Sequence, residues 1–572
     1  MSRTGKNLST KRLRIITGFF IFTALILGVR LYFVQVVHGD EFNDRADRQY
    51  VQTTQDLFTR GSIYFTNKDG EHVSAATLKS GYLLAINPRT IEDAQAAYTA
   101  LSEIVEIEKD SFFLKAGKDD PYEVILNRLS EEKADAISAL GIDGVKVYKE
   151  RWRFYPGQDL ASHVLGFVGY NGDTLEGRYG AEEYWNDTLS EHTENLYINF
   201  FAEVFSQVGE TIVSGNSQRS GDIQLTIEPT VQRELEKQLQ EAAETWNSKM
   251  VAGIIMDPQT GAIRAMGVTP SFNPNTYNEE RDVGVFTNSL VQNVYEMGSI
   301  IKPLTIAAGL DAGVITPETT YNDTGTIEVN GEKISNYDKR ARGVVNMQEV
   351  LNQSLNTGVS FVVQRLGNER FSEYMRGYGI QSLTNIDLPG EVAGLTENLS
   401  SPRDIEHFTA SFGQGIAMTP IATVRALATL ANGGRLVTPH VTDSIKYDIG
   451  IRRDIEKPVK EGVIRPSTSE EISRMLVGAV DDALVGGTEK REGYNIAAKT
   501  GTAQIPAPNG GYYDDRFLHS FFGYFPAYEA KYLIFLISLE PQGARYASET
   551  LTDPFMDLVD FLISYYQIPP DR

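Results

Sequence analysis

The sequence contains no cysteine among its 572 residues. This absence excludes disulfide bonds, a thiol nucleophile and zinc sites that depend on cysteine. Histidine is scarce as well: seven are scattered along the chain, and none forms an H-E-x-x-H pattern. The glycine-rich stretches lack the lysine spacing of a nucleotide-binding loop. We therefore expect no metal ion and no other cofactor.

Excess positive charge is also missing, because the net charge at neutral pH is −23. We expect no nucleic-acid partner, since binding to a phosphate backbone relies on lysine and arginine. The composition is that of a globular protein, with 41% hydrophobic and 23% charged residues. The chain is too long for one ordinary domain, so at least two are expected.

One long apolar run lies near the N-terminus, over residues 15–37. It is long enough to span a bilayer as a helix, and residues 1–14 before it carry several basic side chains and no acidic one. The positive-inside rule then predicts a cytoplasmic tail over residues 1–14, with the rest of the chain outside the cell membrane. A cleaved signal peptide is the alternative, but the run is long and no small-residue cleavage site follows it. Arg30, inside the run, either snorkels to the interface or contacts another membrane protein.

Two domains are predicted after the anchor, over residues 38–221 and 222–572. The first alternates short strand and helix patterns and holds no catalytic constellation; Ser130 is expected to cap one of its helices. The second predicts strands at 251–256, 262–266, 497–504, 519–525 and 532–539, with helices at 230–245 and 555–566. Strands at both ends with helices between them indicate an α+β domain, built on a mainly antiparallel sheet with helices on its faces.

The segment Ser299-Ile300-Ile301-Lys302 offers a serine nucleophile with a lysine one helical turn away. Pro303 fits a helix only in its first turn, so we expect Ser299 at a helix N-terminus, where backbone N–H groups favour negative charge. A lysine can take the serine proton if burial and nearby cations lower its pKa. The alternative is a capping serine with a surface lysine, as expected at Ser130.

Two further motifs follow in the chain. Ser354-Leu355-Asn356 offers a hydroxyl and an amide, and Lys499-Thr500-Gly501-Thr502 predicts a strand that carries a cation and a glycine for close backbone approach. Each motif alone could be a polar turn or an ordinary edge strand. Similar patterns also occur elsewhere, as at Lys79-Ser80-Gly81 and Ser214-Gly215-Asn216. The order of the three motifs therefore matters more than any one of them.

In order and spacing, these motifs resemble those of the penicillin-recognising serine acyl-transferases. The resemblance is to class B penicillin-binding proteins and covers nearly the whole chain. It also rests on Arg60-Gly61-Ser62-Ile63-Tyr64, Arg153-Phe154-Tyr155-Pro156, residues 163–169, Gly180-Ala181-Glu182 and Ser411-Phe412-Gly413-Gln414-Gly415. Two departures are visible: residues 65–70 lack the usual Asp-Arg-Asn-Gly, and the second motif is Ser-Leu-Asn instead of Ser-Ser-Asn. Neither removes a catalytic group.

The resemblance implies an elongated pedestal similar to a dimerisation domain, followed by a serine β-lactamase-like transpeptidase domain. It implies that Ser299 attacks the penultimate D-Ala carbonyl of a peptidoglycan stem peptide, with Lys302 as general base, and that terminal D-Ala leaves. The remaining implied roles are a proton relay through Ser354 and Lys499, an oxyanion hole from the backbone N–H groups of Ser299 and Thr502, and substrate binding by Asn356, Thr500, Gly501 and Thr502.

The resemblance also implies partners: stem peptides ending in D-Ala-D-Ala, covalently bound β-lactams, a polytopic glycosyltransferase and division proteins. The compact pedestal, the Ser354-Leu355-Asn356-Thr357-Gly358 block and the short C-terminal ending resemble the septal type. An elongation-type enzyme and a D,D-carboxypeptidase are the alternatives within this chemistry. A scaffold that activates the glycosyltransferase is an alternative of a different class.

Overall fold

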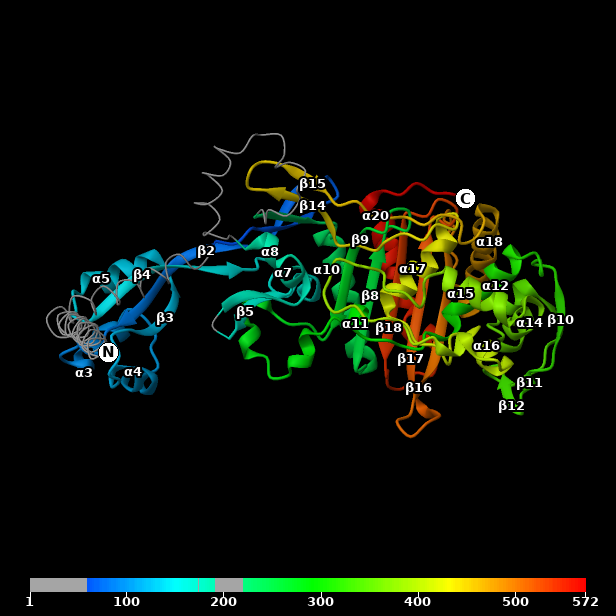
Figure 1. The fold of residues 1–572 in the computed structure, drawn as a ribbon, viewed down its shortest axis with the longest axis horizontal. Coiled ribbons are helices and arrows are strands. Elements are labelled where there is room, and N and C mark those ends of the chain that lie inside the picture. The colour runs from blue at the N-terminus through cyan, green and yellow to red at the C-terminus, as the bar shows by residue number, and fades with distance from the viewer. Residues whose placement is uncertain (1–58, 173, 191–219) are drawn as a thin grey trace, which may run out of the picture. The chain divides into compact units, whose positions relative to one another are not determined.

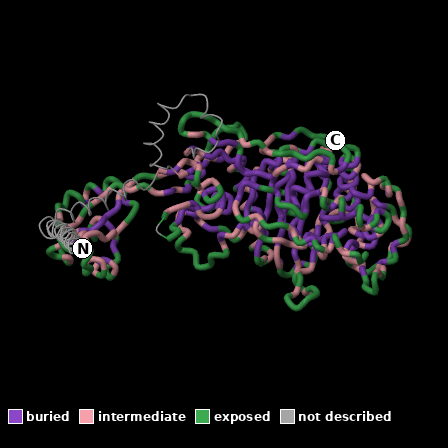
Figure 2. The backbone as a smooth tube through the Cα atoms, in the orientation of Figure 1, coloured by how far each residue is buried: buried purple, intermediate pink, exposed green. Residues whose placement is uncertain are grey.

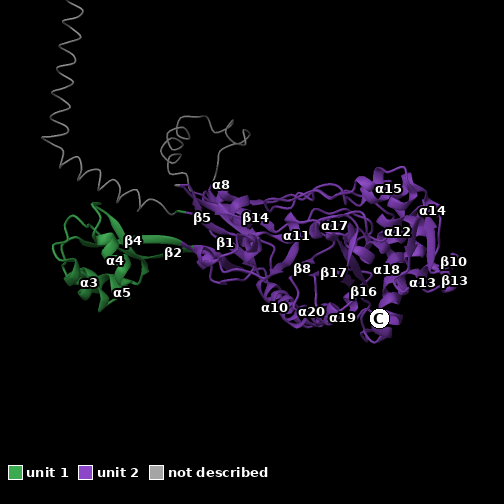
Figure 3. Ribbon diagram, turned by 90° about the horizontal axis from the view of Figure 1, so that it is seen from below, with its two compact units in different colours: residues 1–59, 78–152 green, residues 60–77, 153–572 purple. Residues whose placement is uncertain are grey.

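The computed structural model describes residues 59–172, 174–190 and 220–572. The chain divides into two compact units, of which residues 78–152 form the described body of the first (Figure 3). The second unit holds residues 60–77 and 153–572. The expected membrane helix over residues 15–37, with Arg30, lies outside the described residues. Among the residues that are described, no helix is both long and apolar enough to span a membrane.

The first unit is a small α/β body. Strand β2 (His72–Ile86) pairs antiparallel with β3 (Glu123–Leu129) and also pairs with β4 (Val145–Phe154). Helices α3 (Ala94–Ser102), α4 (Lys109–Ala116) and α5 (Glu131–Ala139) accompany these strands, and apolar side chains such as Leu84, Leu101 and Phe112 form the core. The hydroxyl of Ser130 accepts the N–H of Lys133 at 3.4 Å, which confirms the predicted helix cap.

A second sheet, in the second unit, joins segments that are far apart in the sequence. Strand β1 (Ile63–Thr66) pairs antiparallel with the first half of β2 and parallel with β7 (Gly221–Leu225). Strand β14 (Thr442–Tyr447) pairs antiparallel with β7 and with β15 (Arg452–Asp454). The same unit contains α6 (Ser162–Leu165), β5 (Phe167–Asn171), β6 (Thr174–Arg178), α7 (Gly180–Tyr184) and α8 (Asn186–Leu189). In the view of Figure 1, β5, α7 and α8 lie below β14 and β15.

A buried charge cluster holds this part of the second unit together. Glu182 is fully buried, and its carboxylate lies 2.7 Å from Nε of Arg60 and 2.6 Å from Nε of Arg153. The hydroxyl of Tyr155 donates to the same carboxylate at 3.1 Å. Three of the segments on which the family resemblance rests therefore meet at one buried anion.

A separate sheet of the second unit has five antiparallel strands in the order β16-β17-β18-β8-β9. Their bounds are β16 (Ala497–Pro506), β17 (Tyr512–Phe525), β18 (Tyr532–Leu539), β8 (Met250–Met256) and β9 (Ile263–Thr269). The central strands are apolar and buried along nearly their whole length, because helices cover both faces. The predicted α+β architecture is therefore confirmed, although β17 begins at Tyr512, earlier than predicted.

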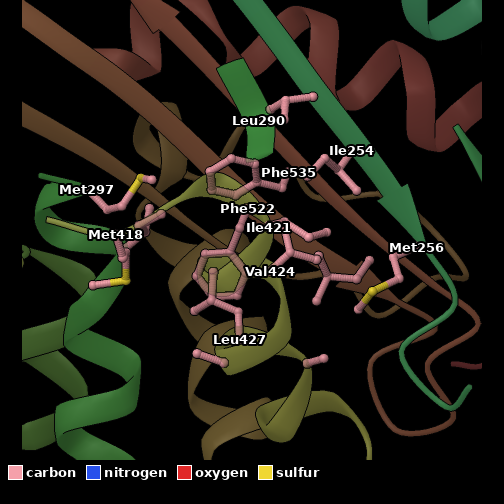
Figure 4. Close-up of a cluster of buried hydrophobic side chains, with 14 of the residues drawn as sticks. Ile254, Met256, Leu290, Met297, Met418, Ile421, Val424, Leu427, Phe522 and Phe535 are labelled. Carbon is pink, nitrogen blue, oxygen red and sulfur yellow. The ribbon is translucent and has the colours of Figure 1, made fainter. Parts of the chain in front are cut away.

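Helices α10 (Pro229–Trp246) and α20 (Thr552–Tyr566) pack on one face of this sheet, where Leu235, Val251, Phe521 and Phe555 share a core. Helices α17 (Pro420–Ala431) and α18 (Pro466–Asp482) pack on the other face, and α12 (Lys302–Asp311) contacts both of them. Figure 4 shows side chains of α17 meeting Ile254, Phe522 and Phe535 of the strands. Figure 2 shows that buried residues are concentrated in these layers.

A helical region follows α12 in the chain and completes the domain. It contains β10 (Thr320–Asp323), β11 (Thr326–Val329), β12 (Glu332–Ser335), β13 (Gly343–Asn346), α13 (Met347–Asn352), α14 (Asn356–Leu366), α15 (Asn368–Gly377) and α16 (Asp404–Ala410). Helices α13 and α14 both contact α12, so the short link between them lies near the start of the helix that follows Ser299.

Candidate active site

Ser299 lies in a tight turn that leads directly into a buried helix. Residues Gly298–Ile301 form one 3-10 turn, α12 begins at Lys302, and Pro303 occupies its first turn. The predicted position of Ser299 at a helix N-terminus is confirmed, with the difference that its own turn is 3-10. Gly298 has φ +65°, a conformation that favours glycine, and its N–H donates to the oxygen of Gly413 at 3.1 Å.

Lys302 is fully buried at the start of α12. Its Nζ donates to the backbone oxygen of Ser354 and, at 3.0 Å, to the Ser354 hydroxyl. Burial and, after it, the nearby charge of Lys499 hold the pKa of Lys302 well below its usual value. The amine is therefore biased toward its neutral form, which is the form that can accept a proton.

Ser354 and Asn356 lie where α13 ends and α14 begins. Ser354 has φ 55°, a strained backbone conformation for a residue other than glycine, and such strain is concentrated at functional sites. Asn356 opens α14, and its Nδ2 donates to the oxygen of Ser335 on β12 at 2.8 Å. Its side-chain oxygen accepts no hydrogen bond from any residue that the structure describes. That oxygen is available to a ligand.

Strand β16 carries the third motif at the edge of the five-stranded sheet. Lys499 is only 7% exposed, and burial lowers its pKa to about 8; its Nζ donates to the oxygen of Thr500 at 3.0 Å. Gly501 is buried against the turn of Ser299, because a Cβ there would lie 2.9 Å from the backbone oxygen of Met297. The hydroxyl of Thr502 accepts the N–H of Ala547 at 3.0 Å, which leaves its own proton free to be donated.

These segments surround one cleft of about 700 Å³, a size suited to a small peptide segment. Six of the residues predicted from the motifs line it: Ser299, Ser354, Asn356, Lys499, Thr500 and Thr502. Of the other two, Lys302 reaches Ser354 from the buried side, and Gly501, within β16, packs against the turn of Ser299. The structure therefore brings all three motifs together.

Other residues at the cleft were not predicted from the sequence. Glu296 accepts hydrogen bonds from the Tyr512 hydroxyl at 3.0 and 3.1 Å and from the N–H of Gly415 at 3.1 Å. It thereby ties the start of β17 and the Gly413–Gly415 turn to the segment that leads into Ser299. The only local signal was its position three residues before the serine. Glu296 itself is not among the lining residues of the cleft. Tyr337, Lys339, Arg545 and Tyr546 do line it, and no motif marks them.

The arrangement supplies a hydroxyl nucleophile, a buried amine biased toward its neutral form, a second hydroxyl bonded to that amine, and a cation on a strand edge. This set suits acyl transfer through a covalent serine intermediate. Among residues 59–172, 174–190 and 220–572, no group of three histidine, aspartate or glutamate side chains is placed to hold a metal ion.

Comparison with known proteins finds two matching family models and several similar proteins. The family model described as the penicillin-binding protein transpeptidase domain matches residues 251–559, and the model of the penicillin-binding protein dimerisation domain matches residues 57–197. Stage V sporulation protein D of Bacillus subtilis is 29% identical, over 96% of this chain and 84% of its own. Peptidoglycan D,D-transpeptidase FtsI of Escherichia coli is 24% identical, over 99% and 93%.

A solved structure of penicillin-binding protein 3 from Mycobacterium tuberculosis, complexed with aztreonam, has a similar fold. Its TM-score is 0.67 at 21% identity, and the match covers 90% of this chain and 98% of that one. The two matched family models together span most of the described chain. The chain therefore belongs to the class B penicillin-binding proteins, the family of peptidoglycan D,D-transpeptidases.

Proposed function

We propose that this protein cross-links peptidoglycan through a serine acyl-enzyme formed on Ser299. The observation that carries the proposal is the fully buried Lys302 amine, which bonds the Ser354 hydroxyl and has a pKa well below its usual value. A serine hydroxyl reacts only when a base removes its proton, and a buried neutral amine one turn away is such a base.

In the proposed reaction, the amine of Lys302 takes the proton of Ser299 while the serine oxygen attacks the penultimate D-Ala carbonyl. The backbone N–H groups of Ser299 and Thr502 would stabilise the oxyanion, an effect of about 3 kcal/mol for each donor. The C–N bond then breaks, and Ser354 and Lys499 would relay the proton to the departing D-Ala nitrogen. An amine from a neighbouring strand attacks the ester, forms the new peptide bond and releases the serine.

Substrate binding would use the groups that the structure leaves available. The side-chain oxygen of Asn356 would accept a substrate N–H. The hydroxyl of Thr502, which already accepts a backbone N–H, would donate to the terminal carboxylate together with Thr500 and Lys499. A β-lactam would acylate Ser299 by the same attack on its strained amide. The M. tuberculosis protein of similar fold, solved with aztreonam, supports this proposal.

We further propose a single-pass anchor over residues 15–37, a cytoplasmic tail over 1–14 and an extracytoplasmic cleft, because the donor peptide lies outside the membrane. The apolar run and the basic residues before it support this placement. A septal role, with a polytopic glycosyltransferase and division proteins as partners, is supported by the sequence features named above. Lateral rather than septal localisation of a fluorescent fusion would instead favour the elongation type.

The central experiment compares wild type with Ser299→Ala. We expect the variant to lose covalent labelling by a fluorescent penicillin and to form no cross-linked product from a pentapeptide and an acceptor amine. Ser130→Ala is the matched control, because Ser130 belongs to the same S-x-x-K pattern but only caps a helix. Undiminished labelling of Ser299→Ala would overturn the assignment.

Product analysis separates the remaining alternatives. Mass spectrometry distinguishes a cross-linked dimer from the tetrapeptide that a carboxypeptidase would release. A scaffold role predicts that Ser299→Ala still complements loss of the wild-type protein, whereas the proposed transpeptidase role predicts failure.

A further inference from the structure

Two cations line the cleft with Ser299 without forming an ion pair. Lys339 and Arg545 are both exposed, and neither side chain makes an ion pair or hydrogen bond with another residue that the structure describes. Lys499 is a third cation of the lining, and Asp514 is the one acid among the described residues that line the cleft. In a chain of net charge −23, the cleft therefore has a local excess of positive charge. Such an excess in a concave site attracts anions.

The acids beside these two cations are engaged elsewhere. Asp338 precedes Lys339, but its two carboxylate oxygens accept hydrogen bonds from Arg342 at 2.9 and 3.0 Å. Glu549 lies near Arg545, but its carboxylate accepts the backbone N–H groups of Arg545 and Tyr546 at 3.0 and 2.8 Å. Neither acid is paired with the side chain of Lys339 or Arg545.

An aromatic contact joins the two segments that carry the cations. The rings of Tyr337 and Tyr546 meet edge to face, with 5.9 Å between their centroids. Tyr337 lies two residues before Lys339, and Tyr546 follows Arg545, whose guanidinium carbon lies 5.6 Å from the Tyr546 centroid. Lys339 and Arg545 therefore flank the place where the two walls of the cleft meet.

The segment that carries Arg545 is fixed to the strand of the third motif. His519 on β17, opposite Thr502 in the sheet, lies 3.2 Å from the oxygen of Arg545 through Nε2 and 2.8 Å from the hydroxyl of Thr550 through Nδ1. Burial lowers the pKa of His519 to about 4, so the ring is neutral at pH 7. Its Nε2 then donates to Arg545, because a carbonyl oxygen only accepts. The contacts of His519 therefore hold the backbone of Arg545 in place against β17.

We propose that Lys339 and Arg545 form an anion subsite that binds a second carboxylate of the donor peptide, on a residue N-terminal to its D-Ala pair. This inference rests on the proposed function and deepens it, because it names the donor as a stem peptide with a free carboxylate besides its C-terminus. Exposed charge pairs contribute modestly, so we expect a preference of about three- to tenfold for such a donor.

The test uses two synthetic donors that end in D-Ala-D-Ala and differ only at the residue before that pair, which carries a carboxylate in one and a carboxamide in the other. Acyl-enzyme formation by the full chain is followed by mass spectrometry without an acceptor amine, and the readout is the ratio of the two acylation rates. The wild-type ratio should be about three to ten and should fall as salt is added.

The ratio should approach one in Lys339→Ala/Arg545→Ala and fall below one in Lys339→Glu/Arg545→Glu. Lys333→Ala/Arg453→Ala is the matched control: both residues are exposed, lie outside the cleft and form no ion pair within the described chain. This control should keep the wild-type ratio.

A wild-type ratio near one, or a ratio unchanged by charge reversal, would overturn the subsite while leaving the acyl-enzyme intact. If the preference for a carboxylate appears only when an acceptor amine is added, the bound carboxylate belongs to the acceptor. That result would also overturn the proposed donor subsite. If wild type forms no acyl-enzyme with either donor or with penicillin, the proposed function fails, and the subsite fails with it.

Discussion

Replacing Lys302 by methionine removes the buried amine beside Ser354 with little change in side-chain volume. Within the described part of the chain, both side-chain hydrogen bonds of the amine go to Ser354. Loss of a general base costs about 10²- to 10⁴-fold in rate. We expect the rate of Ser299 acylation by a fluorescent penicillin to fall about a thousandfold at pH 7.

Stability should change much less than the rate. The variant leaves the backbone oxygen of Ser354 without one donor, a loss of about 1–3 kcal/mol. It also removes an amine whose charged form is disfavoured by burial, which offsets part of that loss. Methionine keeps the apolar contacts of the lysine stem in α12, so the fold should persist.

The assay combines stopped-flow acylation with thermal unfolding followed by circular dichroism. Leu304→Met is the matched control, because it places the same side chain at another buried position of α12 without removing an amine. Acylation of Lys302→Met within tenfold of wild type, in a protein that remains folded, would show that another group takes the serine proton.

Three further predictions concern buried charges. Lys499→Met should raise the pKa of Lys302, because the charge of Lys499 helps to lower that pKa. In a plot of acylation rate against pH, the rising part of the curve should therefore move to higher pH. A curve that does not move would contradict the coupling between the two lysines. In wild type, Lys499 is charged below its pKa of about 8, so acylation by carboxylate substrates should decline as pH rises through that value. Glu182→Gln should lower the free energy of unfolding in urea by about 3–5 kcal/mol, because two buried guanidinium groups lose their anion, and a loss below about 1 kcal/mol would refute that role.

The surroundings of Glu182 decide whether its contribution to the free energy of unfolding grows or shrinks as pH falls. Burial alone would raise the pKa of its carboxyl, but the guanidinium groups of Arg153 and Arg60 outweigh burial and lower it. The stabilisation is therefore fully present above the unfolded value of 4.5 and is lost as pH falls through the lower folded pKa. The difference between wild type and Glu182→Gln should shrink in acid.

Strands with continuous apolar runs were predictable from the sequence because burial on both faces of a sheet leaves a local signal. Residues 532–539 and 251–256 are of this kind, and β18 and β8 match them closely. The start of β17 was missed because residues 512–516 are polar and mostly exposed, so nothing local separates them from a loop. The parallel pairing of β1 with β7 was also unpredictable, since it joins distant segments.

The same difference between local signals and contacts of distant segments explains which cleft residues were predicted from the sequence. Ser299, Ser354 and Lys499 each belong to a short pattern with its own chemical meaning, so each could be named before the fold was known. Tyr337 and Tyr546 acquire their meaning only when the fold brings their rings together. Contacts between distant loops depend on tertiary packing, and no local spacing encodes them.

Ser130 and Lys133 show what turns a sequence pattern into a reactive site. They share the S-x-x-K pattern with Ser299 and Lys302, yet the Ser130 hydroxyl accepts the Lys133 N–H and both residues are exposed. A lysine in water keeps its proton at neutral pH and cannot act as a base. Lys302 differs because α12 is buried on all sides at that point and because the edge strand of the sheet brings a second cation near it. The chemistry thus depends on the packing of α12 beside the edge strand β16, and these two elements lie far apart in the sequence of the domain.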